Sequence, residues 1–125
     1  MTQTQVRTRG DSLARVTHNQ QIGPSYFRLG LQLEGEAAQI YARFRPGQFV
    51  ELKLDNAALP APAAIPPELA DLAQRYIILR RPFSLCSLEV EATSAILEII
   101  YGIIGPGTVR MTKLQPGQSV SVLGV

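Results

Sequence analysis

The chain has 125 residues, 46% of them hydrophobic and 18% charged, and a formal net charge of +2 at pH 7. This length suffices for one hydrophobic core, and the 10 glycines and 9 prolines suit a turn-rich β fold. The basic residues are scattered except for Arg80 and Arg81, so the charge pattern does not indicate a nucleic-acid-binding surface. The single cysteine, Cys86, excludes an intramolecular disulfide framework and any cluster held by four thiolates of this chain alone.

The N-terminal segment, residues 1–11, is polar and has no apolar stretch, so we do not interpret it as a secretory signal. No apolar run approaches the roughly 20 residues of a membrane-spanning helix. We therefore expect a cytoplasmic protein. His18 is the sole histidine and has no cluster of Asp, Glu or Cys beside it in the sequence, so we expect no metal site.

The first half of the chain predicts three strands. Residues 12–20 mix β-branched and polar side chains and predict an edge strand. Residues 26–33 alternate polar and apolar side chains with a period of two, which is typical of a strand with one buried face. A Pro-Gly turn at 46–47 precedes a third strand at residues 48–54.

Residues 55–75 are rich in proline and alanine and are interpreted as an insertion. Four prolines lie between Pro60 and Pro67, both included, so no sheet ladder can run through this segment. A proline and an acidic residue followed by apolar residues at helical spacing predict a short helix over residues 67–74.

The second half predicts three further strands. Residues 76–79 and 83–85 flank the Arg-Arg-Pro element of a bent strand, and the isoleucine-rich residues 95–104 predict a core strand buried on both faces. Residues 108–114 predict one or two helical turns with Thr108 near the cap, and residues 119–122 predict the last strand. The chain is thus predicted to be one all-β domain, 1–125: a six-stranded antiparallel Greek-key barrel with one or two short helices.

Two motifs carry the functional prediction. Arg81-Pro82-Phe83-Ser84 closes one apolar run, and Gly-Pro-Gly-Thr at residues 105–108 follows another. An arginine offers a planar fork to a pyrophosphate, glycines let the backbone approach closely, and amides at a helix start face negative charge. The pair therefore indicates a site for a phosphorylated cofactor such as a flavin dinucleotide.

The whole chain resembles the flavin-binding barrel of the ferredoxin reductase family, and in detail the electron-transfer subunits of bacterial dihydroorotate dehydrogenases. The segments that carry the resemblance begin at residues 46 (Pro-Gly-Gln-Phe-Val), 80 (Arg-Arg-Pro-Phe-Ser-Leu), 99 (Ile-Ile-Tyr-Gly-Ile-Ile-Gly-Pro-Gly-Thr) and 114 (Leu-Gln-Pro-Gly-Gln-Ser-Val). The resemblance implies FAD as cofactor and the catalytic subunit of dihydroorotate dehydrogenase as partner. Electrons would pass between that partner and NAD in pyrimidine biosynthesis. Family members continue into nicotinamide-binding and iron–sulfur parts, which these 125 residues lack, so we expect no turnover by this chain alone.

The resemblance also implies roles for individual residues. Arg81 would neutralise the pyrophosphate, Pro82 and Phe83 would present backbone and a flat surface to the flavin ring, and Ser84 would donate a hydrogen bond near its reactive nitrogen. The stretch along the dinucleotide would consist of Ile100, Tyr101 and Gly102, and the pyrophosphate cap of Gly107 and Thr108. Relatives commonly have a basic residue where this chain has Gly102.

Plainer interpretations of the same residues remain open. Arg81 and Ser84 also suit an edge strand facing solvent, Gly107 and Thr108 a simple helix cap, and Tyr101 a core position. Cys86 is interpreted as a buried structural thiol. Two other functions stay open as well: a cofactor-free β-barrel interaction module, and the flavin domain of another ferredoxin reductase-like oxidoreductase.

Overall fold

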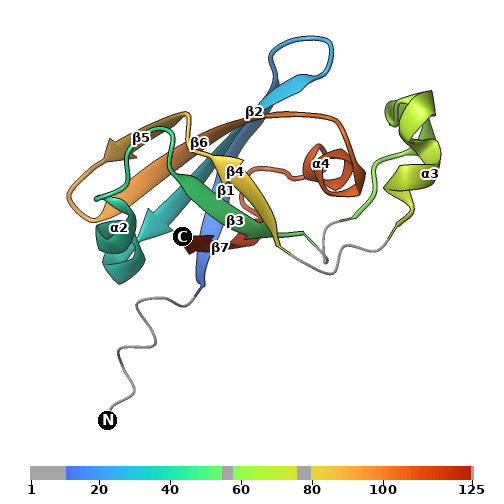
Figure 1. Cartoon of the computed structure of the whole chain (residues 1–125). Coiled ribbons are helices and arrows are strands. Elements are labelled where there is room, and N and C mark those ends of the chain that lie inside the picture. The colour runs from blue at the N-terminus through green and yellow to red at the C-terminus, as the bar shows by residue number, and fades with distance from the viewer. Residues whose placement is uncertain (1–10, 55–57, 76–79, 125) are drawn as a thin grey trace.

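The computed structural model describes residues 11–54, 58–75 and 80–124 (Figure 1). Within these ranges seven strands form one sheet in the order β4-β3-β7-β1-β2-β6-β5, and each neighbouring pair is antiparallel. The strands are β1 (Ser12–Gln21), β2 (Tyr26–Glu34), β3 (Phe49–Lys53), β4 (Arg81–Ser84), β5 (Ser87–Val90), β6 (Ser94–Gly102) and β7 (Ser119–Gly124). The all-β class and the antiparallel pairing are confirmed.

The predicted closed barrel of six strands is wrong, because the sheet is an open half-barrel of seven. Its two edge strands, β4 and β5, are separated in the chain only by Leu85 and Cys86. Leu85 donates its backbone N–H to Gln48 O beside β3 (2.8 Å), and Cys86 donates to Glu98 O of β6 (2.7 Å). The sheet therefore curls so far that its two edges come close together, and the consecutive residues Leu85 and Cys86 connect them. Pro82 suits β4 because an edge strand tolerates a residue without an N–H.

Two strand predictions need correction. Residues 12–20 are not an edge strand, since β1 lies between β2 and β7. The isoleucine-rich strand is not buried on both faces: Ala95, Leu97, Ile99 and Tyr101 are buried, whereas Ile100 is 40% exposed. In a half-barrel only the inner face of the sheet is buried, so side chains of β6 are alternately buried and more exposed. The sequence does not show this alternation, because apolar residues occur on both faces of the strand. The prediction for residues 76–79 lies outside the described residues.

The core fills the inner face of the curled sheet. Leu29, Leu31 and Leu33 of β2 are fully buried, as their period-two spacing predicts, and they pack with the inward residues of the other strands. Burying one such side chain stabilises the fold by roughly 1.5–3 kcal/mol. The other buried members of this cluster are Ala14, Val16, Tyr41, Val50, Leu52, Leu54, Leu85, Leu97, Ile99, Tyr101, Met111, Leu114, Val120 and Val122.

Short helices lie at opposite sides of the sheet (Figure 1). Helix α2 (Gly35–Tyr41) was not predicted, because Gly35, with φ of 60°, was interpreted only as the end of β2. Its Tyr41 packs on Phe44, with ring centroids 4.9 Å apart. Helix α4 (Pro106–Met111) lies on the other side, next to the insertion.

The proline-rich insertion contains only short helical segments in its described part. They are η1 (Pro62–Ala64), η2 (Pro67–Leu69) and α3 (Ala70–Ala73). The last two cover the helix predicted at residues 67–74. Arg110 of α4 donates a hydrogen bond to Ala73 O (2.8 Å), which fastens the insertion to α4. The described residues include no helix with the length and hydropathy needed to cross a membrane.

Candidate functional site

The two motifs singled out in the sequence meet in space. Arg81, at the start of β4, pairs with the buried Leu52 of β3 and is itself half-buried. A Cβ atom added at Gly107 would lie 3.3 Å from Arg81 Cγ, 3.5 Å from Arg81 Nε and 3.2 Å from Leu54 Cδ1. The arginine side chain therefore passes directly over the first turn of α4. A glycine at position 107 permits this approach, because a larger residue would displace its neighbours.

Thr108 organises the start of that helix. Its hydroxyl accepts hydrogen bonds from the N–H groups of Ile104 (2.9 Å) and Gly105 (3.0 Å) and donates to Gly105 O (3.2 Å). Thr108 thus stabilises the turn from the third helical position rather than from the cap, which is Gly105. Its hydroxyl is fully engaged in this turn, and the side chain is buried.

The backbone amides at the start of α4 belong to residues that are largely buried, Gly107 and Thr108 among them. Pro106 has no N–H, and Val109 N–H donates to Gly105 O (2.9 Å). Within the described ranges the N–H groups of Gly107 and Thr108 have no acceptor, as is usual in the first turn of a helix. Two unsatisfied donors and a guanidinium therefore gather at one place, which is a suitable donor set for an anion.

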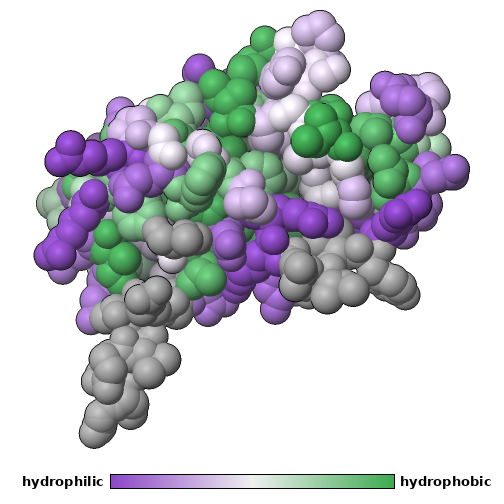
Figure 2. Space-filling view, in the orientation of Figure 1, coloured by the Kyte–Doolittle hydropathy of each residue, from purple (hydrophilic) through white to green (hydrophobic). Residues whose placement is uncertain are grey.

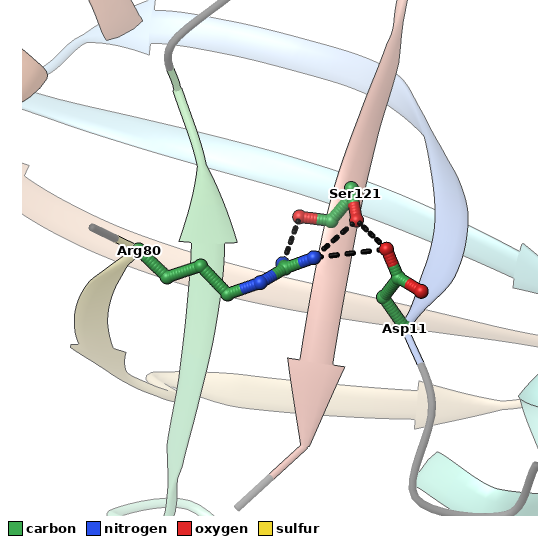
Figure 3. A network of polar contacts seen from close by, with 3 residues as sticks. All are labelled: Asp11, Arg80 and Ser121. Carbon is green, nitrogen blue, oxygen red and sulfur yellow. Dashed lines mark hydrogen bonds and ion pairs between the residues drawn. The ribbon is translucent and has the colours of Figure 1, made fainter. Parts of the chain in front are cut away.

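The tandem arginines have different surroundings, and Figure 3 shows those of Arg80. Arg80 Nη2 donates to Asp11 Oδ2 (2.8 Å) and to Ser121 Oγ (2.9 Å), and Ser121 Oγ donates to Asp11 Oδ2 (2.7 Å). The hydrogen bond from Ser121 is the main cause of the lowered pKa of Asp11. Among the described residues, no side-chain hydrogen bond or ion pair engages Arg81. Arg80 is therefore tied to the fold by polar contacts, whereas the Arg81 side chain packs over Gly107 without such contacts among the described residues.

The remaining residues of the first motif divide between two faces of β4. Phe83 pairs with Val50 and packs against the core, whereas Pro82 and Ser84 are exposed on the opposite face. Ser84 pairs with Phe49, whose side chain is 55% exposed. A ligand on the outer face of β4 would meet Pro82 and Ser84 but only the backbone of Phe83.

The predicted stretch in β6 does not form one surface. Tyr101 is buried, stacks on Phe27 with ring centroids 5.5 Å apart, and donates its hydroxyl to Asn19 Oδ1 (2.9 Å). Burial raises the pKa of this phenol. Ile100 and Gly102 point to the outer face of the sheet, where a Cβ at Gly102 would lie 3.1 Å from the ring of Tyr26. Tyr101 is thus a core aromatic in this fold.

Two other candidate groups lie apart from this place. Cys86 is exposed, so the interpretation as a buried thiol is wrong; its position between two edge strands leaves it outside the core. His18 Nε2 lies 2.8 Å from Glu98 Oε2, and Glu98 Oε1 accepts a hydrogen bond from Ser87 (2.8 Å). Within the described part of the chain, no three His, Cys, Asp or Glu residues are grouped as metal ligands.

Two hollows flank α4. The first, of about 700 Å³, is lined by Lys53, Arg110 and Lys113 together with residues of β7; Leu54 also lines it and lies beside the Arg81–Gly107 contact. The second, of about 460 Å³, lies between the β1–β2 turn and the insertion. None of the predicted site residues lines either hollow, and no sequence signal indicated them, since each joins segments far apart in the chain.

Comparisons with known proteins give the family context. No family model matches the chain. It is 39% identical over 79 residues to the dihydroorotate dehydrogenase B (NAD(+)), electron transfer subunit, of Geobacillus thermodenitrificans, a match that covers 63% of this chain and 23% of that protein. It is 36% identical over 94 residues to the Listeria monocytogenes serotype 4b protein of the same name, covering 75% of this chain and 28% of that protein. These similarities confirm the predicted resemblance.

The chain spans about a quarter of the length of these curated relatives. Among solved structures it is similar to the siderophore-interacting protein SipS from Aeromonas hydrophila, with a TM-score of 0.59 and 24% identity. That match covers 94% of this chain and 46% of the SipS chain. At this identity the likeness concerns the fold.

Proposed function

We propose that this chain binds FAD and forms the flavin-carrying part of an electron-transfer protein. In the complete protein, electrons would pass between a partner flavoenzyme, the catalytic subunit of dihydroorotate dehydrogenase, and NAD in cytoplasmic pyrimidine biosynthesis. The names of the curated relatives support the electron-transfer role. The proposal about partner and pathway rests on those names, because the chain corresponds to only a part of each relative.

One observation carries the cofactor proposal: the Arg81 side chain lies over Gly107 at the start of α4. Bound phosphates would receive charge-assisted hydrogen bonds from the guanidinium and hydrogen bonds from the N–H groups of Gly107 and Thr108. Because Gly107 has no Cβ, the Arg81 side chain can approach the backbone of the helix closely. The residues present therefore fit a diphosphate.

The flavin ring would lie along the outer face of β4. Pro82 and Ser84 are exposed there, and the exposed ring of Phe49 is beside Ser84. Ser84 would supply a hydroxyl to the polar edge of the ring, while Pro82 and Phe49 would supply apolar contact. FAD itself supplies the electron-transfer chemistry, and the chain supplies binding and orientation.

A titration of the purified chain with FAD and with flavin mononucleotide, followed by flavin fluorescence, tests the proposal. The dinucleotide is expected to bind more tightly, because only it has the pyrophosphate that Arg81 and α4 would hold. Equal affinities for the two flavins, or no binding of either, would contradict the proposal.

A second candidate function is a cofactor-free module that docks on a partner protein. Three of the predicted FAD contacts do not converge with Arg81, since Tyr101 is in the core and Ile100 and Gly102 face outward. Ile22, Tyr26 and Ile104 expose 46%, 55% and 77% of their surface near the β1–β2 turn. Retained folding without any flavin binding would favour this function.

A further inference from the structure

We infer that the hollow between the β1–β2 turn and the insertion, here called the proline pocket, receives the adenine of the dinucleotide. The inference rests on the proposed function and assigns a role to the insertion. The pocket is lined by Gln21, Pro24, Phe27, Pro60, Ala63, Ala64, Ile65, Pro66, Pro67, Ile103 and Thr112. Figure 2 shows the surface hollowed between the turn at the top of the view and the insertion at the right.

The lining of the proline pocket suits an uncharged aromatic ring. It contains no charged side chain, so it offers nothing to a phosphate and little to the ionised parts of a substrate. Proline, alanine and isoleucine side chains supply flat apolar walls, and Phe27 supplies an aromatic one. Phe27 is held in place because its ring stacks on Tyr101, with ring planes 16° apart. The volume of the proline pocket, about 460 Å³, lies in the usual range for small-ligand pockets.

One polar side chain of the pocket, that of Gln21, can accept a hydrogen bond from the edge of a base. Gln21 donates its side-chain N–H groups to Gly23 O (3.0 Å) and Pro24 O (3.3 Å) within the β1–β2 turn. These bonds fix the amide, and within the described residues its Oε1 atom accepts no hydrogen bond. A fixed carbonyl oxygen is a suitable acceptor for the exocyclic amino group of adenine.

The pocket lies close to α4, where the diphosphate is proposed to bind. Ile103, just before the turn that begins α4, and Thr112, which caps its end, both line the pocket. A helix of six residues is about 9 Å long. Gly107 lies in the chain between these two lining residues, so a diphosphate at Gly107 would be within about one helix length of residues that line the pocket. The insertion supplies much of the lining and is fastened to α4 by the Arg110–Ala73 hydrogen bond.

Competition against bound FAD tests the inference without any substitution. Inorganic pyrophosphate probes the phosphate-binding residues alone, whereas ADP adds the adenosine. ADP is expected to displace FAD at a concentration at least roughly tenfold lower than pyrophosphate, as contact with one base can supply. If FAD binds and ADP competes no better than pyrophosphate, the inference is wrong and the proposed function stands. If FAD does not bind, the proposed function fails, and the inference fails with it.

A matched pair of variants places the effect in the pocket. Ala64 lines the pocket and is exposed, whereas Ala61, which is also exposed and lies in the same insertion, does not line it. Ala64→Trp is expected to fill the pocket and remove the advantage of ADP over pyrophosphate, with pyrophosphate competition unchanged. Ala61→Trp is expected to keep the advantage. An unchanged ADP advantage in Ala64→Trp, or an equal loss in both variants, would overturn the inference.

Discussion

Arg80 and Arg81 are neighbours in the sequence, yet their surroundings predict opposite effects of substitution. Arg81→Ala is expected to weaken FAD binding by about tenfold to a hundredfold, since charge-assisted hydrogen bonds contribute roughly 1.5–3 kcal/mol each. The fold should persist, because the Arg81 side chain makes no hydrogen bond or ion pair within the described residues, and alanine keeps the backbone pairing of β4. Flavin fluorescence measures the affinity and urea unfolding measures the stability.

Arg80→Ala is the matched control for this experiment. It removes the hydrogen bonds to Asp11 and Ser121 and is expected to lower the free energy of unfolding by about 1 kcal/mol, with FAD affinity nearly unchanged. Arg81→Lys keeps the charge but loses the planar fork and should bind FAD with intermediate affinity. If Arg81→Ala unfolds the chain while Arg80→Ala does not, Arg81 is structural.

Glu98 is expected to make the free energy of unfolding depend on pH in the acidic range. Burial opposes its ionised form, but hydrogen bonds from Ser87 and His18 and the charges of Arg28 and His18 outweigh it and lower its pKa below the ordinary 4.5. A lowered folded-state pKa means that the unfolded chain binds the proton more readily. The stabilisation is therefore present above about pH 4.5 and is lost as the pH falls through the folded-state pKa.

Glu98→Gln is expected to remove this contribution. Urea midpoints measured between pH 3 and pH 7 should fall less steeply at the acidic end for the variant than for the native chain. The variant keeps the size of the side chain and one acceptor oxygen for Ser87. Parallel pH profiles for the two proteins would show that Glu98 does not contribute to the acid sensitivity.

At the scale of one element, α4 connects the proposed anion-binding residues to the core. Gly107→Ala places a Cβ 3.2 Å from Leu54 Cδ1 and 3.3 Å from Arg81 Cγ, so the arginine must shift by a few tenths of an ångström. FAD affinity is expected to fall by severalfold. Alanine favours a helix over glycine by up to about 1 kcal/mol, so stability should change little.

Gly105→Ala provides the comparison. A Cβ there meets no described atom within 4 Å, and the extended backbone of Gly105 accepts any residue. We expect a small loss of stability from the poorer cap and little loss of affinity. Equal losses of FAD affinity in the two variants would contradict the proposed role of Gly107.

The elements also show where sequence patterns suffice and where they fail. The alternation in residues 26–33 predicts β2 because each leucine of that strand faces the core. The run of isoleucines in β6 hides a similar alternation, and only the pairing with β2 shows that Ile100 faces outward and Tyr101 inward. Strand β5 was missed because it is short and partly polar, and its place depends on pairing with β6.

The candidate site could likewise be predicted only in part, because local chemistry is visible in the sequence and the packing of distant segments is not. The chemistry of arginine, glycine and threonine indicates an anion without knowledge of the fold. The meeting of Arg81 with Gly107 depends on the curl of the sheet, which brings β4 beside α4. The proline pocket had no signal in the sequence, because its walls come from the β1–β2 turn, the insertion and both ends of α4.

At the scale of the whole molecule, the chain is expected to carry a flavin without completing electron transfer to nicotinamide. A nicotinamide site needs a glycine-rich turn between a strand and a helix, and the comparable turn at residues 105–108 is already assigned to the diphosphate. A two-iron cluster generally needs four protein ligands, typically thiolates, and the sequence has only Cys86.

The purified chain, reconstituted with FAD and supplied with NADH, should therefore show no appreciable NADH oxidation above that of free FAD. Iron and sulfide analysis after reconstitution should give no stoichiometric cluster. Because Cys86 is exposed, one alternative has to be tested, in which several copies of the chain bind one cluster through their Cys86 thiolates. Cys86→Ser distinguishes this case, since it would abolish a shared cluster and leave FAD binding unchanged. NADH oxidation by the isolated chain, retained in Cys86→Ser, would show that the flavin domain alone contains the nicotinamide site.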